Sequence, residues 1–158
     1  MSLNRRLLLT RGAALALASA LPIRAFAAQG SFPFELSDVE WRARLSENQH
    51  LVLREHQTEQ PYTSALLEEG RAGTFACAGC GQALFSSQAK FDSRTGWPSF
   101  WQPLPGAVGE APDASAGMNR TEVHCSNCGG HLGHVFNDGP EPTGLRYCIN
   151  GLALTFAA

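Results

Sequence analysis

Two short cysteine motifs constrain the fold of this 158-residue chain more than any other feature. Residues 77–81 read CAGCG and residues 125–129 read CSNCG. The two-residue gap lets both thiolates of a turn face one ion, and the following glycine relieves backbone crowding. Two such turns form a closed tetrahedral zinc site with no open coordination position. We therefore predict one structural zinc ion with four ligands: Cys77, Cys80, Cys125 and Cys128.

Two other interpretations of these cysteines stay open. An oxidising compartment would favour two disulfides, and a single Cys-x-x-Cys motif can be a redox-active dithiol. A disulfide within either turn would close a loop too short to constrain much of the chain. The pairing of the motifs favours zinc, and their wide separation means that the ion would join distant parts of the fold.

Residues 1–27 have the pattern of a cleaved export signal. They carry four arginines and no acidic residue, an apolar stretch at 12–21, and the small-x-small ending Ala-Phe-Ala. The pair Arg5 and Arg6 resembles a twin-arginine signal, and the alternative is a cytosolic protein with a basic amphipathic start. Cleavage after Ala27 would leave a linker at 28–36 and a domain at 37–158, which predicts a periplasmic protein.

The charge of the chain argues against nucleic acid as a partner. The net charge is −2, and without residues 1–27 eight basic side chains face fourteen acidic ones, a net charge of −6. Binding to nucleic acid depends on neutralising phosphates, which an acidic domain does poorly. A membrane-spanning helix needs about 20 apolar residues, and the sequence offers no such run, so we predict no stable membrane span.

Helices are predicted only at the start of the domain. Residues 37–40 and 46–49 both fit the capping-box pattern, in which side chains satisfy the first free helix N–H groups. Short helices should follow, near 38–44 and 47–56.

The rest of the chain predicts strands. Short runs of strand-forming residues lie between Gly- and Pro-rich turns, at 120–125, 131–136, 145–150 and 153–156. Residues 102–119, rich in Pro, Gly and Ala, are expected to form a surface loop. The predicted class is mainly β: a small antiparallel β domain with short N-terminal helices.

The fifth cysteine, Cys148, lies in the run LRYCIN at 145–150. In a strand, side-chain alternation puts Arg146, Cys148 and Asn150 on one face. A cation beside a thiol favours the thiolate, which is the nucleophilic form. The alternative is a buried, unreactive cysteine of a core strand.

Two histidines, His131 and His134, lie in the run GGHLGHVF at 129–136. Each is either a core imidazole or an additional zinc ligand, but four cysteines already complete a zinc site. Both are therefore available for hydrogen bonding or proton transfer near a nucleophile. The run GWPSF at 96–100 could equally be core packing around a proline turn.

The order of these motifs resembles that of the B-type methionine sulfoxide reductases. The resemblance rests on CAGCG, FDS at 91–93, GWPSF, CxxCGGHLGHVF and RYCIN, and it runs from about Ser37 to Phe156. It implies two packed antiparallel sheets, often called a β-tent, with N-terminal helices. It also implies the activity of a peptide-methionine (R)-S-oxide reductase, which reduces the R epimer of methionine sulfoxide in oxidised peptides and proteins.

The resemblance also implies roles for single residues. Cys148 matches the nucleophile that attacks the sulfoxide sulfur, which leaves a sulfenic acid. His134 matches the histidine that assists protonation of the sulfoxide oxygen, and Trp97 the indole that packs on the substrate methyl group. Other matching or neighbouring polar and aromatic residues are expected in the same pocket, with His131 and Asn150 in catalysis and Arg146 and Phe136 in substrate binding.

The sequence departs from the family pattern at two positions. Thr95 stands where many members have a second, resolving cysteine, and Gly151 stands where a serine commonly follows the active-site asparagine. With the other four cysteines assigned to zinc, an external reductant should reset Cys148, either a thioredoxin-like protein or a small thiol. Resolution by one of the zinc cysteines is the alternative.

Three other classes of protein compete with this interpretation. A zinc-ribbon binding module suits neither an export signal nor an acidic domain. A secreted disulfide-bonded domain would leave one thiol unpaired and the histidines unexplained. A different thiol enzyme on the same scaffold is the strongest rival, and an assay with each sulfoxide epimer separates all of them.

Overall fold

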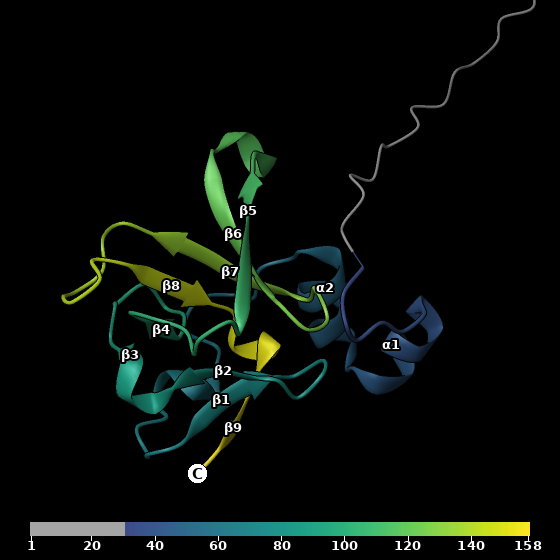
Figure 1. The fold of residues 1–158 in the computed structure, drawn as a ribbon, viewed down its shortest axis with the longest axis horizontal. Coiled ribbons are helices and arrows are strands. Elements are labelled where there is room, and N and C mark those ends of the chain that lie inside the picture. The colour runs from purple at the N-terminus through teal and green to yellow at the C-terminus, as the bar shows by residue number, and fades with distance from the viewer. Residues whose placement is uncertain (1–30) are drawn as a thin grey trace, which may run out of the picture. The chain divides into compact units, whose positions relative to one another are not determined.

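Two antiparallel β-sheets form the centre of the described chain, residues 31–158 of a computed structural model (Figure 1). The smaller sheet has the order β2-β1-β9, with β1 at Thr74–Cys77, β2 at Ala83–Ser86 and β9 at Leu154–Ala157. The larger has the order β3-β4-β8-β7-β6-β5. Its strands are β3 Lys90–Phe91, β4 Ser99–Phe100, β5 Val108–Asp113, β6 Arg120–Cys125, β7 His131–Phe136 and β8 Arg146–Ile149. The predicted mainly β class with two antiparallel sheets is confirmed. The predicted export signal lies outside the described residues.

Two short α-helices precede the sheets, as predicted. α1 spans Asp38–Arg44 and α2 spans Glu47–Glu55, and a complete capping box precedes each one, at Ser37 and at Ser46. Each serine hydroxyl accepts a hydrogen bond from the third helical N–H, which removes one of the unsatisfied donors of a helix start. Single 3₁₀ turns lie at Ala65–Leu67, Ser87–Ala89, Ser115–Gly117 and Gly151–Ala153.

Hydrogen bonds link the two helices to the two cysteine turns. Arg44 of α1 donates from Nε to the carbonyl of Gly79 at 2.6 Å, and Arg54 of α2 donates to the carbonyl of Cys128 at 3.0 Å. The Arg54 guanidinium also lies over the ring of Trp41, 4.9 Å from its centroid. A guanidinium on a helix thus satisfies a carbonyl of each turn, so the helices and the turns support one another.

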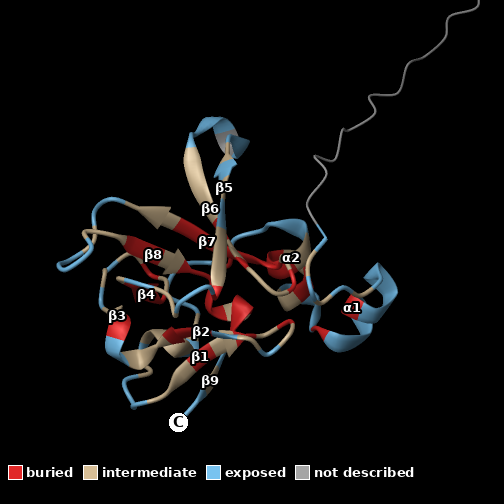
Figure 2. Ribbon diagram, in the orientation of Figure 1, coloured by how far each residue is buried: buried red, intermediate tan, exposed pale blue. Residues whose placement is uncertain are grey.

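Aromatic rings fill the space between the sheets. Phe75 and Phe85 come from the small sheet and Phe100 from the large one, and all three are fully buried. The rings of Phe85 and Phe100 stack with centroids 4.3 Å apart, while Phe75 meets Phe100 edge-on at 5.0 Å. Figure 2 shows buried segments on the strands of both sheets. This layer is the core that holds one sheet on the other.

The loop predicted for residues 102–119 is wrong in its middle, because β5, Val108–Asp113, pairs with β6 over its full length. Proline cannot donate to a strand ladder, but β5 is an edge strand, where Pro112 is tolerated. A side chain at Gly109 would collide with the ring of His124 unless that ring moved, so glycine fits best there. The residues that suggested a loop are compatible with an edge strand.

The ends of two strands differ slightly from prediction. The strand predicted at 145–150 spans Arg146–Ile149, and the one predicted at 153–156 spans Leu154–Ala157. Asn150 keeps an extended backbone but lies outside the strand, as the residue that precedes the 3₁₀ turn Gly151–Ala153. Within residues 31–158, no helix has the length and apolar character needed to cross a membrane.

Candidate functional site

A small pocket opens over the middle of the large sheet, where β8 lies between β4 and β7. Cys148 of β8 is directly opposite His134 on β7 and Ser99 on β4. The strands approach closely because residue 133 is glycine, and a side chain there would collide with the Cys148 carbonyl. The pocket has a volume of about 120 Å³ and eight lining residues: Thr58, Trp97, Arg120, Gly133, His134, Phe136, Cys148 and Asn150.

The Cys148 thiol is largely buried, which decides its ionisation. Burial raises the pKa of Cys148 above its ordinary value, although a hydrogen bond from Thr95 and the charge of Arg146 act to lower it. The sequence predicted that Arg146 would favour the thiolate, and it does act in that direction. The prediction missed that desolvation outweighs the cation. Burial therefore favours the thiol of Cys148 over its thiolate.

Trp97 and Asn150 are held in the pocket by the backbone of Glu59. The Trp97 indole donates from Nε1 to the Glu59 carbonyl at 3.2 Å, and the Glu59 N–H donates to Asn150 Oδ1 at 3.0 Å. The Asn150 amide also donates to the carbonyl of Leu132 at 3.0 Å. Both ends of the Asn150 side chain are therefore engaged, so Asn150 fixes the geometry of the pocket wall.

The carboxylate of Glu59 adds a further link behind the pocket. It accepts hydrogen bonds from the N–H groups of Gly151 and Leu152, which open the 3₁₀ turn after Asn150. Burial raises the pKa of Glu59, and the two N–H donors act against this effect. One residue thus joins the segment after α2 to the walls formed by Trp97 and Asn150.

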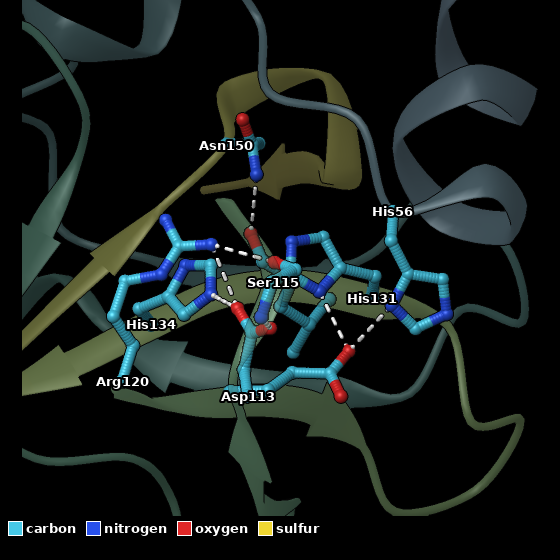
Figure 3. A network of polar contacts seen from close by, with 9 residues as sticks. His56, Asp113, Ser115, Arg120, His131, His134 and Asn150 are labelled. Carbon is cyan, nitrogen blue, oxygen red and sulfur yellow. Dashed lines mark hydrogen bonds and ion pairs between the residues drawn. The ribbon is translucent and has the colours of Figure 1, made fainter. Parts of the chain in front are cut away.

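His134 forms an ion-pair network with Asp113 and Arg120 (Figure 3). His134 Nε2 lies 2.7 Å from Asp113 Oδ2, and the Arg120 guanidinium lies 2.7 Å from the same oxygen. Hydrogen bonds from Ser115 and His134 and the charge of Arg120 hold the pKa of Asp113 well below its usual range. An ionised carboxylate only accepts, so His134 Nε2 carries a proton and Nδ1 is the atom whose protonation changes. Burial lowers the pKa of His134 despite the attraction of Asp113.

His131 faces a different cavity. Its Nδ1 lies 2.7 Å from Glu122 Oε1, and His56 Nδ1 lies 3.0 Å from the same oxygen (Figure 3). These side chains line a cavity of about 220 Å³ that also borders His134. Both Nδ1 atoms face the Glu122 carboxylate, whereas His131 Nε2 is buried without a hydrogen-bond partner among the described residues. The structure therefore places His131 beside His134, with ring centroids 5.4 Å apart, but not in the lining of the Cys148 pocket.

Arg146 and Phe136 lie together at the Cys148 side of the pocket. The Arg146 guanidinium lies over the Phe136 ring, 4.4 Å from its centroid, and forms two hydrogen bonds of 2.8 Å with Asp138. Phe136 lines the pocket and Arg146 does not. Arg146 is thus paired with a carboxylate and acts on Cys148 through its charge.

The four cysteines of the paired turns form one cluster between the sheets. Cys77 ends β1 of the small sheet and Cys125 ends β6 of the large sheet. The sulfur atoms of Cys77 and Cys128 are 3.8 Å apart, and those of Cys80 and Cys125 are 3.6 Å apart. Four sulfurs at about 2.3 Å from a tetrahedral ion would be about 3.8 Å from one another. The cluster therefore has the dimensions of a site for one metal ion.

The two turns of this cluster have the same local structure. Gly81 and Gly129 both have positive φ, 80° and 67°, and each donates its N–H to the carbonyl of the first cysteine of its turn. Glycine adopts this backbone conformation without strain, which is why it follows each motif.

Sequence reasoning missed the acidic residues that organise the site: Glu59, Asp113 and Glu122. Each is a single carboxylate in a segment without a recognisable motif, and each contacts a residue far away in the sequence. The only local signal is at Asp113, which accepts a hydrogen bond from the N–H of Ser115 and so forms a turn.

Comparison with known proteins gives the family. The SelR domain matches residues 45–158, most of the chain. The chain belongs to the SelR family. Among its relatives is a peptide methionine sulfoxide reductase MsrB of Bradyrhizobium diazoefficiens, 59% identical over 119 residues that cover 75% of this chain and 86% of that protein. The enzyme of the same name from Leptospira interrogans is 54% identical over 121 residues, which cover 76% of this chain and 92% of that protein.

Membership of the SelR family agrees with the motifs that the sequence displays. A third relative of the same name, from Leifsonia xyli, is 53% identical over 132 residues and covers 82% of this chain and 95% of its own length. The resemblance to B-type methionine sulfoxide reductases is therefore confirmed. The matched SelR segment includes the pocket residues from Thr58 onward and the whole cysteine cluster.

Proposed function

We propose that this protein reduces the R epimer of methionine sulfoxide, in peptides and proteins, to methionine. The observation that carries the proposal is the position of Cys148. It is the one cysteine outside the cluster of four, and it lines a pocket together with an indole and an imidazole. An enzyme that reduces sulfoxides with a thiol needs a nucleophile, an apolar surface for the substrate methyl group and a group that transfers a proton. This pocket contains all three.

The reaction transfers one oxygen atom from the substrate to Cys148. The thiolate attacks the sulfoxide sulfur, the sulfur–oxygen bond of the substrate breaks, and the products are methionine and a sulfenic acid on Cys148. The sulfur of Cys148 is oxidised by two electrons and that of the substrate is reduced by two. The proton lost from the thiol is kept by the transferred oxygen, so the atoms balance.

His134 and Trp97 supply the other two requirements. Sulfoxide oxygen leaves poorly unless it is protonated. His134, with Nε2 held by Asp113, would take the proton of the Cys148 thiol on Nδ1 and pass it to that oxygen. The indole of Trp97 is the apolar wall on which the substrate methyl group packs. We expect His134→Ala to lower kcat by roughly 10²–10⁴, the usual effect of losing a positioned acid–base group.

The test is an assay with separate epimers. Protein lacking residues 1–27 is incubated with N-blocked methionine R-sulfoxide or S-sulfoxide and dithiothreitol, and methionine formation is measured. We expect turnover of the R epimer only, and none with Cys148→Ser, because a hydroxyl is a far weaker nucleophile than a thiolate. Efficient reduction of the S epimer, or an active Cys148→Ser variant, would contradict the proposal.

Zinc is the metal that we propose for the cysteine cluster. Four thiolates at tetrahedral spacing suit Zn²⁺ and leave no open coordination position, so the ion would be structural. Held by Cys77, Cys80, Cys125 and Cys128, it would tie the end of β1 to the end of β6 and so join the two sheets.

An external thiol is the reductant that we propose for the oxidised enzyme. Thr95 contacts Cys148 at the place where a resolving cysteine would stand, and a hydroxyl cannot form a disulfide. A thioredoxin-like protein or a small thiol would attack the sulfenic acid, release water and form a mixed disulfide. A second thiol then frees Cys148.

The reset is tested by omitting the reductant. Fully reduced enzyme reacts with the R epimer, and its products are analysed by mass spectrometry. We expect about one methionine per enzyme, as a single nucleophile allows, and a Cys148 adduct with a sulfenic-acid trap. A disulfide between Cys148 and a cluster cysteine, formed as fast as turnover, would identify that cysteine as the resolver instead.

Export to the periplasm is the last part of the proposal. It is supported by the sequence of residues 1–27, with the paired Arg5 and Arg6 and the small-x-small ending. A twin-arginine route carries folded protein, so the metal would be bound in the cytosol before the thiolates meet an oxidising compartment.

A further inference from the structure

Three hydroxyl groups connect the Cys148 thiol to a backbone carbonyl. Thr95 Oγ1 lies 3.8 Å from Cys148 Sγ and 2.8 Å from Ser93 Oγ. Ser93 Oγ lies 2.6 Å from Ser99 Oγ, which in turn lies 3.1 Å from the carbonyl oxygen of Trp97. Four consecutive contacts thus lead from the reactive sulfur to the main chain of the residue that forms the pocket wall.

The number of hydrogens fixes the direction of this chain. Each hydroxyl and the thiol have one hydrogen to donate, so four groups supply four hydrogens for four contacts. The Trp97 carbonyl can only accept, so Ser99 must donate to it. Ser93 must then donate to Ser99, and Thr95 to Ser93. All four contacts are hydrogen bonds at once only when the thiol of Cys148 donates to Thr95.

Ionisation of Cys148 removes one of the four hydrogens. A thiolate can only accept, so its bond with Thr95 forms only if the Thr95 hydroxyl rotates and donates to sulfur. Ser93 then donates to Thr95 and Ser99 donates to Ser93. Three hydrogens cannot form four hydrogen bonds, and we place the loss at the contact between Ser99 and the Trp97 carbonyl because it is the longest of the three oxygen–oxygen contacts.

We propose that Thr95, Ser93 and Ser99 form a hydrogen-bond chain that reverses direction when Cys148 ionises, holding the thiol protonated at rest and donating to the thiolate during attack. Thr95 touches the reacting sulfur and is a catalytic residue, whereas Ser93 and Ser99 are positioning residues. The relevance of the chain to turnover rests on the proposed function, in which Cys148 is the nucleophile. The hydrogen-bond chain itself follows from the distances between its atoms and does not depend on that function.

The charged groups around Cys148 come from several elements and are separate from this chain. Arg146 lies on the same strand and is paired with Asp138, which follows β7. His134 faces Cys148 from β7, and Arg120 of β6 lines the same pocket. None of these four side chains hydrogen-bonds to a hydroxyl of the chain. Substitutions within the chain therefore change the hydrogen bonds of Cys148 and leave its charged neighbours in place.

The chain predicts opposite effects for substitutions at its two ends. Thr95→Val removes the only hydroxyl that reaches sulfur, so the thiolate loses a donor and the pKa of Cys148 should rise by about one unit, a tenfold loss of thiolate. Ser99→Ala removes the group that must give up the Trp97 carbonyl on ionisation. Ionisation then breaks no bond, so the pKa of Cys148 should fall, by about half a unit or threefold in thiolate.

The experiment measures the pKa of Cys148 without any sulfoxide. Metal-loaded protein is alkylated with iodoacetamide over a range of pH, and the rate is taken from the Cys148 peptide by mass spectrometry, which separates it from the cluster cysteines. Two controls accompany the variants. Thr95→Ser keeps the hydroxyl and should stay near the parent value, and Thr155→Val removes an exposed hydroxyl from β9 and should have no effect.

The signs of the two shifts decide the outcome. A merely structural disturbance would move Thr95→Val and Ser99→Ala in the same direction, and that result would overturn the proposal, as would an unchanged pKa in Thr95→Val. If Ser99→Ala does not fold, Ser93→Ala replaces it, because it also frees Thr95 to donate and should lower the pKa. Opposite shifts in a protein that reduces no sulfoxide would support the chain and reject the proposed function.

Discussion

Gly151 and Ser64 share a space behind the pocket that holds only one side chain. A Cβ atom at Gly151 would collide with the Cβ and hydroxyl of Ser64 and come within 3.2 Å of a Glu59 oxygen. Gly151 departs from the family pattern, and the sequence alone offers no reason for this departure. The structure supplies one, because Ser64 already occupies the volume that a serine at 151 would need.

Gly151→Ser should therefore destabilise this protein. We expect the free energy of unfolding to fall by about 1–3 kcal/mol, the usual cost of overfilling a packed site. Ser64→Gly should cost only a few tenths of a kcal/mol, because glycine is a fair cap for the 3₁₀ turn that follows. The double variant should regain most of the loss, as expected for two residues in contact. Urea unfolding of the four proteins measures this, and equal stability of Gly151→Ser and the parent would contradict it.

At the scale of elements, the cysteine cluster joins the last residue of β1 to the last residue of β6. Because these strands belong to different sheets, loss of the ion should loosen the packing of one sheet on the other. Cys80→Ser removes one ligand, and we expect loss of bound zinc and a melting temperature lower by about 10 °C or more, since structural zinc contributes directly to folding.

Cys148→Ser is the matched control for this experiment, because it makes the same chemical change outside the cluster. Zinc content by elemental analysis and thermal unfolding by circular dichroism are the measurements. We expect Cys148→Ser to keep both values. A zinc-free Cys80→Ser protein with the parent melting temperature would mean that the ion has no structural role.

The contact between the end of α2 and β6 should make stability depend on pH. The hydrogen bond with Glu122 raises the pKa of His56 above 6.5. A raised pKa means that the folded protein favours the protonated histidine. The stabilisation is therefore complete below about pH 6.5 and is lost as the pH rises through the folded value.

His56→Asn tests this contribution. His56 caps α2 in a left-handed conformation with φ 56°, which asparagine adopts readily, so the variant removes the charge and keeps the backbone. We expect the parent to lose more stability than the variant between about pH 6 and pH 8, measured by urea unfolding. The histidines that do not contact Glu122 are common to both proteins and cancel in the comparison. Identical pH dependence in the two proteins would count against the pair.

The helices and strands could be predicted from the sequence better than the way in which the strands pair. Both helices, with their capping serines, and the strands at 120–125 and 131–136 lie where the local pattern put them. β5 was missed because Gly109 and Pro112 carry loop signals, and only the position of β5 at the sheet edge makes them acceptable in a strand. Local patterns record propensity, whereas the sheet order is set by pairing between distant segments.

The same limit applies to the site. Cys148, His134, Trp97, Asn150 and Phe136 were all predicted in one pocket, and all five line it. The supporting carboxylates were not predicted, because those of Glu59 and Asp113 act across 92 and 21 residues of sequence. The ionisation of Cys148 was predicted from one neighbouring cation, whereas its burial, which the sequence does not report, decides the direction.

At the scale of the whole molecule, the export proposal separates the first 27 residues from the catalytic domain. Replacing both Arg5 and Arg6 with lysine should block transport and leave the precursor in the cytosol, because the receptor is expected to read the arginine pair. Replacing Arg11 and Arg24 with lysine keeps the charge and serves as the control. Cell fractionation and immunoblotting measure the result. Normal periplasmic accumulation of the Arg5/Arg6 variant would favour the general secretory route.

The edge position of β5 has a consequence for how the molecule behaves among damaged proteins. An unpaired edge strand is a template on which other extended chains can assemble. Pro112 removes one amide donor from this edge, and Glu110 places a charge on it, both at exposed positions. An enzyme that meets oxidised and partly unfolded polypeptides risks being recruited into their aggregates. Pro112, one of the residues that made this segment look like a loop, and Glu110 therefore act against co-precipitation of the enzyme with its substrates.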